Sequence, residues 1–500
     1  MSQKTLTDGT RAGADKAPAA ASAKRWWILA VVALAQLMVV LDATIVNIAL
    51  PSAQADLGFS DGNRQWIVTA YALSFASLLL LGGRIADLFG RKPAFLVGIV
   101  GFALASALGG ASTSFGMLVT ARALQGVFGA LLAPAALSLL NTTFTDARER
   151  ARAFSVYGAI AGAGGAVGLL LGGFLTDALD WRWTLFVNVP IAVVAFAGGW
   201  FLLTNHRDAA NAKLDVPGTV LVAAGLFGVV YGFSNAESHD WGSPLTWGFL
   251  LAGGLLLVAF TWWQTRTAHP LLPLRILLDR DRGASFIAVL ISGAGMFGVF
   301  LFLTYYLQLN LGFSPTKTGV AFLPMVGALM VAAQVGTTGL LPRIGPKVVI
   351  PSGFAIAAAG MAWLTDIGVG SDFATSVLPQ LIVIGFGLGL VMPPAMQLAT
   401  GGVAAEDAGV ASATVNAMQQ VGGSIGTALL NTLAASAATD YLVGRDPRDK
   451  LVQAQATIES YTTAFWWSAG FFAAGAVIAL VLHRRGVPEQ DPDAAPVVHM

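Results

Sequence analysis

The chain has 500 residues, of which 56% are hydrophobic and only 11% charged, and its net charge is +1. Soluble domains carry about a quarter charged residues, so this composition excludes a soluble globular protein. The absence of cysteine excludes disulfides, iron–sulfur clusters and thiol catalysis.

The apolar residues lie in long runs that approach the roughly 20 residues needed to cross a bilayer as a helix. Lipid offers no hydrogen-bond partners to the backbone, so each run is expected to be helical. We therefore predict an all-α integral membrane protein with fourteen transmembrane helices. The predicted spans are 26–48, 64–83, 93–112, 116–140, 153–175, 184–204, 217–234, 246–263, 285–308, 318–339, 348–367, 375–397, 409–433 and 461–483.

The charges in the loops test this map, because cytoplasmic loops of membrane proteins carry an excess of Lys and Arg. With the N-terminus inside, most of the 28 Lys and Arg residues fall in inner segments. The outer loops hold Arg64, Arg182, Lys317, Arg445, Arg448 and Lys450. This distribution favours an even number of spans with both termini in the cytoplasm.

A faint internal repeat divides the chain. The turns GGRIADLFGRK (82–92) and GLLPRIGPK (339–347) each have a glycine, a short basic turn, a second glycine and a lysine. Internal repeats are a hallmark of secondary transporters. We expect a disordered cytoplasmic tail over 1–24, an N-terminal six-helix bundle over 25–204, two inserted helices and an amphipathic linker over 205–284, a C-terminal six-helix bundle over 285–483 and a cytoplasmic tail over 484–500. For residues 264–283, a plain linker is as open a reading as a segment lying on the membrane surface.

Six segments match the motifs of a known family, in the right order along the chain. They are LDATIVNIALP (41–51), GRIADLFGRK (83–92), RALQGVFGA (122–130), GGAVGLLLGG (164–173), WRWTLFVNVP (181–190) and NAMQQVGGSIGTA (416–428). Together they resemble the fourteen-span drug/proton antiporters of the major facilitator superfamily. Leu88 stands where the loop motif usually has arginine, and Leu169 stands where the fifth-helix motif has proline.

The resemblance implies a major facilitator fold of two six-helix bundles plus two inserted helices, in the bacterial cytoplasmic membrane. It implies proton-coupled efflux of small lipophilic drugs or antibiotics by alternating access, with the proton gradient as the energy source and no cofactor. The expected partners are a small lipophilic substrate, protons and membrane lipid, and we expect the protein to work as a monomer.

Asp42 and Arg122 are the two charges expected well inside the spans, where a charge costs about 3 kcal/mol and usually marks a pathway or a proton relay. Each lies six residues from the outer end of its span, which places both at a depth of roughly 9 Å. Burial would favour the protonated carboxyl and the arginine the ionised one, so we predict that this pair couples protons to transport. The alternative is an ion pair that only fixes packing. Gln125 shares the helix face of Arg122 and is expected to hold the guanidinium or to touch substrate, unless it only packs.

Asp87, Arg91 and Lys92 lie in a tight inner turn. In the family this aspartate pairs with the arginine and with the start of a helix in the second half, which latches the inner side. That helix would be span 13, whose N-terminal dipole attracts an anion. The alternative is simple anchoring of basic residues on the cytoplasmic side.

Four glycines of span 5, Gly164, Gly168, Gly172 and Gly173, recur on one face of the helix. Small residues allow helices to approach closely and to slide. In the family this face meets span 10 and forms the outer gate; static packing is the alternative.

Aromatic and methionine side chains on spans 1, 9 and 12 are candidates for a cavity that repacks around varied apolar ligands. With one glutamine from span 4 and one from span 12, the candidates are Met38, Gln125, Phe297, Tyr305, Tyr306, Met392, Met396 and Gln397. For each of them, contact with lipid or with a neighbouring helix is the alternative.

Several functions are disfavoured. The sequence has no G-x-x-x-x-G-K-[ST] loop, so ATP is not expected to drive transport. The five histidines have no metal-ligand spacing, no catalytic triad can be recognised, and we expect neither an enzyme nor a nucleic-acid partner. The rival functions are an uptake symporter for a nutrient and a membrane sensor that does not transport.

Overall fold

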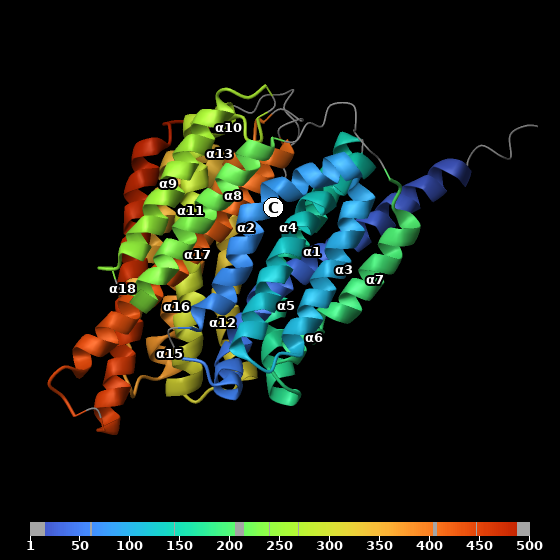
Figure 1. The fold of residues 1–500 in the computed structure, drawn as a ribbon. Helices are drawn as coiled ribbons and strands as arrows, with labels where there is room; N and C mark the ends of the chain where they lie inside the picture. Colours follow the sequence, from blue (N-terminus) through green and yellow to red (C-terminus); the bar gives the residue numbers. More distant parts are fainter. Residues whose placement is uncertain are drawn as a thin grey trace, which may run out of the picture.

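The computed structural model describes residues 16–60, 63–144, 146–205, 215–239, 241–268, 270–403, 408–446 and 448–487. The described residues form helices connected by short turns (Figure 1). We call the end of the bundle at which α10 lies the inner end and the opposite end the outer end, after the predicted topology.

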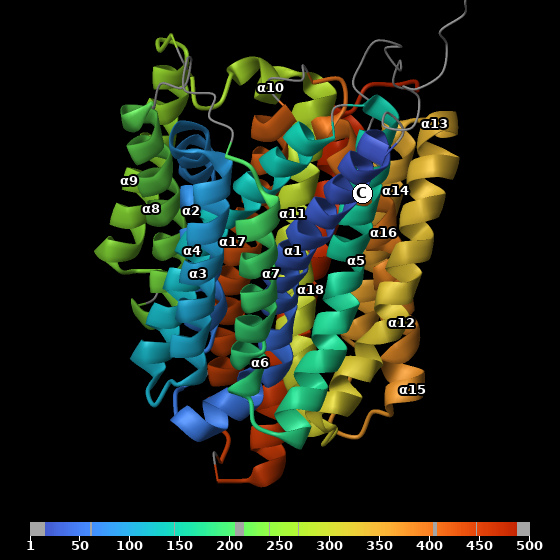
Figure 2. The same cartoon turned by 90° about the vertical axis from the view of Figure 1, so that its right-hand side faces the viewer.

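The helices before residue 205 correspond to the first six predicted spans, and we call them the first group. They are α1 (Lys16–Leu57), α2 (Gln65–Phe89), α3 (Arg91–Gly110), α4 (Phe115–Thr143), α5 (Ala147–Ala178), and α6 (Trp183–Phe186) followed by α7 (Asn188–Leu202). Within this group α4 packs between α2 and α3 (Figure 1), and α1 packs against α5 and α7 (Figure 2). α1 begins at Lys16, so the last part of the expected tail continues the first helix instead.

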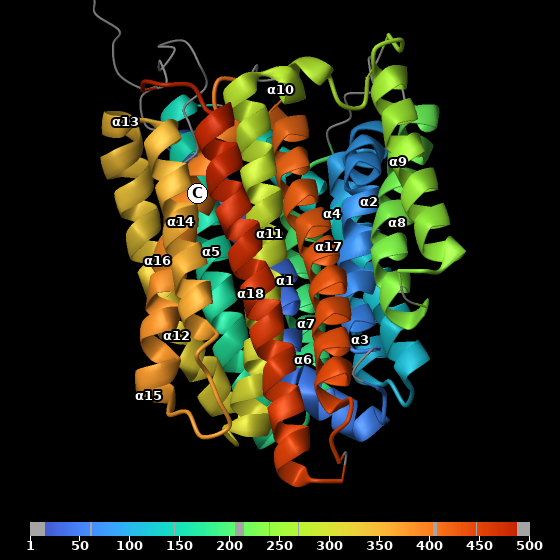
Figure 3. The ribbon, with the colours of Figure 1, turned by 90° about the vertical axis from the view of Figure 1, so that its left-hand side faces the viewer.

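The helices after residue 279 correspond to the last six predicted spans, and we call them the second group. They are α11 (Arg280–Tyr305) with η1 (Tyr306–Asn310), α12 (Pro315–Gln334) with η2 (Val335–Leu340) and α13 (Leu341–Ile344), α14 (Pro346–Leu364), α15 (Phe373–Ser376) with α16 (Leu378–Thr400), α17 (Ala408–Leu442) and α18 (Lys450–Leu482). In this group α16 packs against α12 and α14, and α11 packs against α17 and α18 (Figure 3).

Two further helices, α8 (Val216–His239) and α9 (Pro244–Gln264), form a hairpin at one edge of the bundle. The hairpin contacts α2 of the first group and α17 of the second (Figure 3). The short helix α10 (Leu274–Leu278) follows, across the inner end (Figure 1).

Twelve helices in the described part of the chain are long and apolar enough to cross a membrane. α5 and α17 are not among the twelve; from α5, the stretch Gly164–Ala178 is a shorter apolar helix. The sequence therefore predicted the positions of the helices, while twelve of them, among the described residues, meet the criteria of length and apolarity.

The internal repeat is visible in two turns. Gly90 ends α2 with a φ of 104°, and Gly345 ends α13 with a φ of 76°. Each donates its N–H to the carbonyl four residues back, on Ala86 and Leu341, and the next helix begins at the following residue. Only glycine adopts such a φ without a steric penalty, which explains the glycine before the basic residues in both halves of the sequence.

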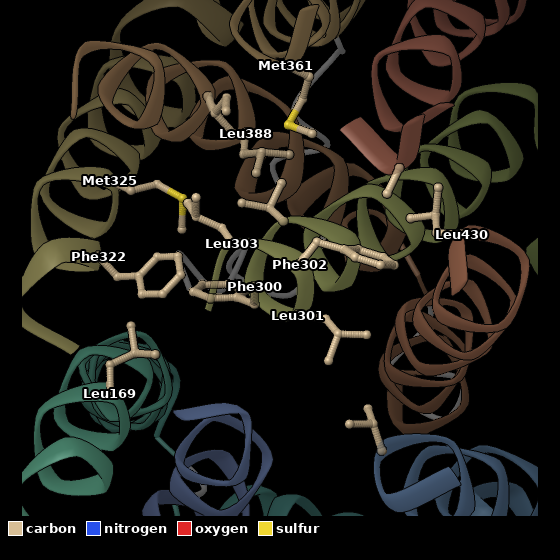
Figure 4. Close-up of a cluster of buried hydrophobic side chains, with 14 of the residues drawn as sticks. Leu169, Phe300, Leu301, Phe302, Leu303, Phe322, Met325, Met361, Leu388 and Leu430 are labelled. Carbon is tan, nitrogen blue, oxygen red and sulfur yellow. The ribbon is translucent and has the colours of Figure 1, made fainter. Parts of the chain in front are cut away.

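The buried hydrophobic core is shared between the two groups at the outer end. Leu169 of α5 is 1% exposed and belongs to the same cluster as Phe300 and Phe322 of the second group. Figure 4 shows its side chain turned toward these rings. The leucine that replaces the motif's proline thus adds apolar contact between the groups.

Candidate functional site

Asp42 of α1 and Arg122 of α4 form an ion pair in the interior of the first group. Arg122 Nη1 lies 2.5 Å from Asp42 Oδ2, and the two side chains are 2% and 0% exposed. Asp42 and Arg122, which the sequence predicts at equal depth, are therefore in direct contact. Removing one partner of a buried pair is strongly unfavourable because the other charge is left uncompensated.

The second carboxylate oxygen of Asp42 accepts two hydrogen bonds from amides. Gln125 Nε2 and Asn188 Nδ2 each lie 2.8 Å from Asp42 Oδ1. Ser106 completes the network, because its hydroxyl accepts from Gln125 at 3.1 Å and from Asn188 at 2.9 Å, and donates to Leu185 O at 2.8 Å. Arg122, Gln125 and Asn188 thus all donate to the carboxylate of Asp42.

Arg122 keeps several partners that do not depend on Asp42. Its Nη1 also donates to Gln125 Oε1 at 2.8 Å, and its Nε donates to Ile67 O of α2 at 3.2 Å. The guanidinium lies over the Tyr71 ring, 4.5 Å from the centroid. The cation is therefore held between α2 and α4 whether or not the carboxylate is charged.

Local sequence explains how these side chains meet. Arg122 and Gln125 are three residues apart and share one face of α4. On a neighbouring face Gly126 lies against Tyr71 O and Ser74 of α2, where a Cβ would clash. This close approach brings the Ile67 carbonyl within reach of Arg122.

The break between α6 and α7 positions Asn188. This residue begins α7, and Pro190 sits in the first turn, where a missing N–H costs no hydrogen bond. The break turns the asparagine amide into the network, and the side chain is fully buried.

Three residues of the network were not selected from the sequence as site residues. Asn188 lies in the quoted WRWTLFVNVP motif, and a polar residue at the start of an apolar helix is a usable signal. Ser106 and Tyr71 carry no such signal, because single serines and tyrosines are common in membrane helices. Gln125, which was expected to touch Arg122 or substrate, contacts Arg122 and Asp42.

The predicted cavity residues do not form a single cluster in this structure. Met38 is fully buried in the core of the first group. The Tyr306 hydroxyl donates to Gly368 O at 3.0 Å, and its ring meets Tyr461 edge-on, so Tyr306 packs within the second group in this structure. The side chain of Phe297 lies outside the described part.

Tyr305 contacts the first group at the outer end instead of lining a cavity. Its hydroxyl donates to Gln54 Oε1 of α1 at 2.5 Å, and the Arg64 guanidinium lies 4.4 Å from its ring centroid. On α16, Met392 is buried, Met396 is partly buried against the core, and Gln397 Oε1 is buried without a hydrogen-bond partner in the described structure.

The predicted inner latch falls partly outside the described residues. This applies to the side chain of Asp87 and to the segment before α17. Lys92 donates to Trp200 O at 2.6 Å and to Leu203 O at 2.8 Å. Lys92 therefore caps the C-terminal end of α7, where a cation is favoured, and does not cross to the second group. Arg91 is half-buried beside it at the start of α3.

The glycine face of α5 meets two helices: α1 along most of its length and α12, the expected span 10, at Gly173. A Cβ on Gly164, Gly168 or Gly172 would meet side chains of α1, whereas on Gly173 it would meet Pro315 and Thr316 of α12. A second glycine, Gly319 of α12, packs in turn against the backbone at Leu169. The contact between α5 and α12 thus depends on Gly173 and Gly319.

With this geometry established, the chain was compared with known proteins. The family model described as Major Facilitator Superfamily matches residues 32–427. The chain belongs to the Major Facilitator Superfamily. Its fold also resembles that of a solved POT family peptide transporter, with a TM-score of 0.69 at 17% identity, covering 96% of this chain and 100% of the other.

Among the curated relatives, the "Puromycin resistance protein pur8" of Streptomyces alboniger is 51% identical and covers 92% of this chain and 91% of the relative. The "Cephamycin export protein CmcT" of Amycolatopsis lactamdurans is 39% identical over 80% of this chain and 83% of the relative. The "Tetracenomycin C resistance and export protein" of Streptomyces glaucescens is 36% identical over 87% and 81%. The superfamily assignment places the chain in a family of multi-pass membrane transporters.

Proposed function

We propose that this protein exports small lipophilic antibiotics across the bacterial cytoplasmic membrane in exchange for protons. Export is supported by the relatives named for resistance and export. Coupling rests on one observation: Asp42 is a fully buried carboxylate whose partners in the described structure are movable side chains, namely one arginine and two amides. The proton gradient supplies the energy, and the protein works as a monomer without a cofactor.

Protonation of Asp42 would release the pair without stranding the cation. Arg122 retains Ile67 O, Gln125 Oε1 and the Tyr71 ring. The protonated carboxyl needs an acceptor, and Asn188 Oδ1 is buried without a partner in the described structure. Rotation of the Asn188 amide would replace its donor by this acceptor. Proton binding would thereby change the contacts between α1, α4 and α7.

Alternating access is supported by contacts between the groups at the outer end. Tyr305 binds Gln54, Gln308 Nε2 donates to Ile48 O at 3.0 Å, and Thr316 N donates to Asp177 at 2.8 Å. We propose that this is an outer-closed state and that opening breaks these contacts. The Gly173 contact with α12 would then act as a gate. The other glycines of span 5 would form the surface on which α5 moves against α1. Asp87 and Arg91 would latch the inner side.

The proposed topology has fourteen spans, with α5 and α17 also crossing the membrane and both termini in the cytoplasm. The α8–α9 hairpin would then be a two-helix insert between two six-helix bundles of the drug/proton antiporter type. Its packing against α2 and α17 supports this arrangement.

Puromycin is the first compound to test, because the relative at 51% identity is named for resistance to it. Inside-out vesicles carrying the protein should accumulate puromycin when the vesicle lumen is made acidic relative to the outside. They should lose this accumulation when the pH gradient is collapsed. Vesicles without the protein are the control. Gradient-driven movement in the opposite direction would support uptake and contradict the proposal. A lack of movement of puromycin, cephamycin and tetracenomycin C would also contradict it.

A further inference from the structure

A buried polar stripe runs between α2 and α17, where the two groups of helices meet. It consists of Gln65 and Thr69 on α2 and Ser424 and Thr427 on α17, each of which is 0–1% exposed. Both side-chain polar atoms of Gln65 and all three hydroxyls are buried without a hydrogen-bond partner in the described structure. We call these four residues the polar stripe.

Several other buried hydroxyls in this chain bond locally, although those of Ser77, Ser292 and Thr304 also have no partner in the described structure. Thr432 donates to Ala428 O, Thr414 to Val410 O and Ser468 to Ala464 O, each bonding the carbonyl four residues back. This local bond is available to any serine or threonine in a helix. The stripe hydroxyls do not make it, and an unsatisfied buried polar group costs about 1–3 kcal/mol. Four such residues at one interface therefore need an explanation.

The register of the two helices places the stripe residues opposite one another. Arg64 Nε donates to Asn431 Oδ1 at 3.2 Å, which fixes the outer ends of α2 and α17. The helices run in opposite directions from this contact. At about 1.5 Å per residue, Gln65 and Thr69 lie roughly 2–8 Å further inward and Thr427 and Ser424 roughly 6–11 Å.

The other faces of α2 are already occupied. The ring centroids of Trp66 and of Tyr231 on α8 lie 5.8 Å apart, and the backbone carbonyl of Tyr71 lies against Gly126 of α4. With about 100° between successive residues, Gln65 and Thr69 lie on the remaining face, toward α17.

The same holds for α17. Its face toward α11 is formed by Gly422, Gly426 and Leu430, which meet Leu290, Ala294 and Gly298. Ser424 lies seven residues from Asn431 and Thr427 four, which is the spacing of a single helix face. This face is the one that carries the Arg64 contact.

We propose that the polar stripe lines the outer passage of the transporter and hydrogen-bonds to uncharged polar groups of the exported molecule: hydroxyl, carbonyl or amide. When the outer ends of α2 and α17 part, the stripe gains the partners that it lacks in the closed state. It contains no charged residue, so it suits neutral hydrogen-bonding groups. The substrate part of this inference rests on the proposed export function; the opening of the passage does not.

The opening can be tested by thiol labelling, since the parent has no cysteine. Thr69→Cys and Thr427→Cys should react with a membrane-impermeant methanethiosulfonate reagent added outside the cell. Ala70→Cys and Leu430→Cys, at similar depths but on the faces toward other helices, are the matched controls. Opening of the closed state would expose the stripe positions but not the controls, so we expect labelling to be about tenfold faster at the stripe. Equal rates at stripe and control positions would overturn the passage.

The substrate contact is tested by transport kinetics. Thr69→Val combined with Thr427→Val should raise the KM of puromycin export about fivefold, the equivalent of one lost hydrogen bond. Thr69→Ser with Thr427→Ser keeps the hydroxyls and should retain the parental KM. A higher melting temperature with an unchanged KM in the valine variant would show a purely structural stripe and overturn the contact. If the parent does not export puromycin, the proposed function fails for this compound, while the labelling still decides whether the passage opens.

Discussion

At the scale of single residues, the Asp42 network joins α1, α4 and α7, and under the proposed coupling one proton would change several of its contacts. The carboxylate accepts from Arg122, Gln125 and Asn188, and these residues come from α4 and α7. A neutral carboxyl can no longer hold the arginine by charge. The helices that meet at this point would then lose part of what joins them, which is the physical link between protonation and conformation.

The first prediction follows from this arrangement. Asp42→Asn keeps the size of the side chain and removes the charge and the exchangeable proton. We expect it to abolish puromycin export driven by the pH gradient while the protein remains folded in the membrane. Asp42→Glu should retain part of the activity with a shifted pH optimum. The measurement is gradient-driven uptake in inside-out vesicles beside membrane yield, and full activity in Asp42→Asn would show that the pair only fixes packing.

At the scale of elements, close approach of helices depends on glycine at specific positions. Gly168 of α5 lies against Thr44 and the Leu41 carbonyl of α1, so a Cβ there would clash. Gly165, three residues earlier, has no such neighbour within 4 Å among the residues that the structure describes. The two positions have the same residue type in the same helix and differ in packing alone.

The second prediction compares them. Gly168→Ala should push α5 away from α1 and cost about 1–3 kcal/mol, the usual range for overpacking. Gly165→Ala should be neutral, or should stabilise the helix by about 0.5–1 kcal/mol because alanine has the higher helix propensity. Melting temperatures of the purified proteins measure the difference. Equal values for both variants would mean that α1 and α5 are not in tight contact.

A second element-level feature fastens the α8–α9 hairpin at its inner end. Asp215, just before α8, is 6% exposed and accepts hydrogen bonds from Gly218 N, Trp263 Nε1 and Gln264 Nε2 at 2.9, 2.7 and 2.8 Å. Burial acts to raise the pKa of this carboxyl, but the hydrogen bonds outweigh burial and hold the pKa below its ordinary value of 3.8. The ionised form thus ties the two helices together.

The third prediction concerns this carboxylate. Its contribution to stability is present above the ordinary pKa and is lost as the pH falls through the lowered value. Asp215→Ala should therefore lower the melting temperature at pH 7, with a loss of about 1.5–3 kcal/mol for hydrogen bonds to a charged group. Asp449, an exposed carboxylate that caps α18 through Leu451 N, is the matched control, and Asp449→Ala should cost less. The difference between the parent and Asp215→Ala should shrink below pH 4. A larger loss in Asp449→Ala, or a difference that persists in acid, would contradict the role of Asp215.

At the scale of the whole molecule, the open question is how many helices cross the membrane. Twelve helices in the described residues meet the criteria of length and apolarity. α5 and α17 lie alongside their neighbours in the bundle (Figures 2 and 3) and pack along their length. If both cross, the turn between α17 and α18 is outside and the residues after α18 are inside.

The fourth prediction tests this topology. Gly444→Cys, in the turn after α17, should react with an impermeant thiol reagent added to intact cells. Val487→Cys, beyond the end of α18, should react only after the cells are opened. Both positions are exposed, so access depends on the side of the membrane alone. Labelling of both from the same side would exclude the proposed fourteen-span arrangement.

The sequence by itself determined the class of protein and the positions of the helices, because an apolar run in lipid has little choice but to become a helix. Asp42 and Arg122 could also be selected in advance, since charges within apolar helices are costly and rarely incidental. Gly90 and Gly345 could be recognised as paired turns from their spacing before lysine. These predictions depend on local composition and spacing, which a single sequence contains.

The tertiary structure alone decided which side chains meet. Asn188 reached Asp42, and Ser106 reached Asn188, because α7 packs against both α1 and α3, while the glycine face of α5 turned toward α1 and left Gly173 for α12. Tyr305 became a contact between the groups and Tyr306 a core residue, although the two are adjacent in sequence. Such outcomes depend on the rotation of each helix about its axis, and in an apolar medium hydrophobic periodicity does not fix that rotation, because the side facing lipid is as apolar as the side facing protein.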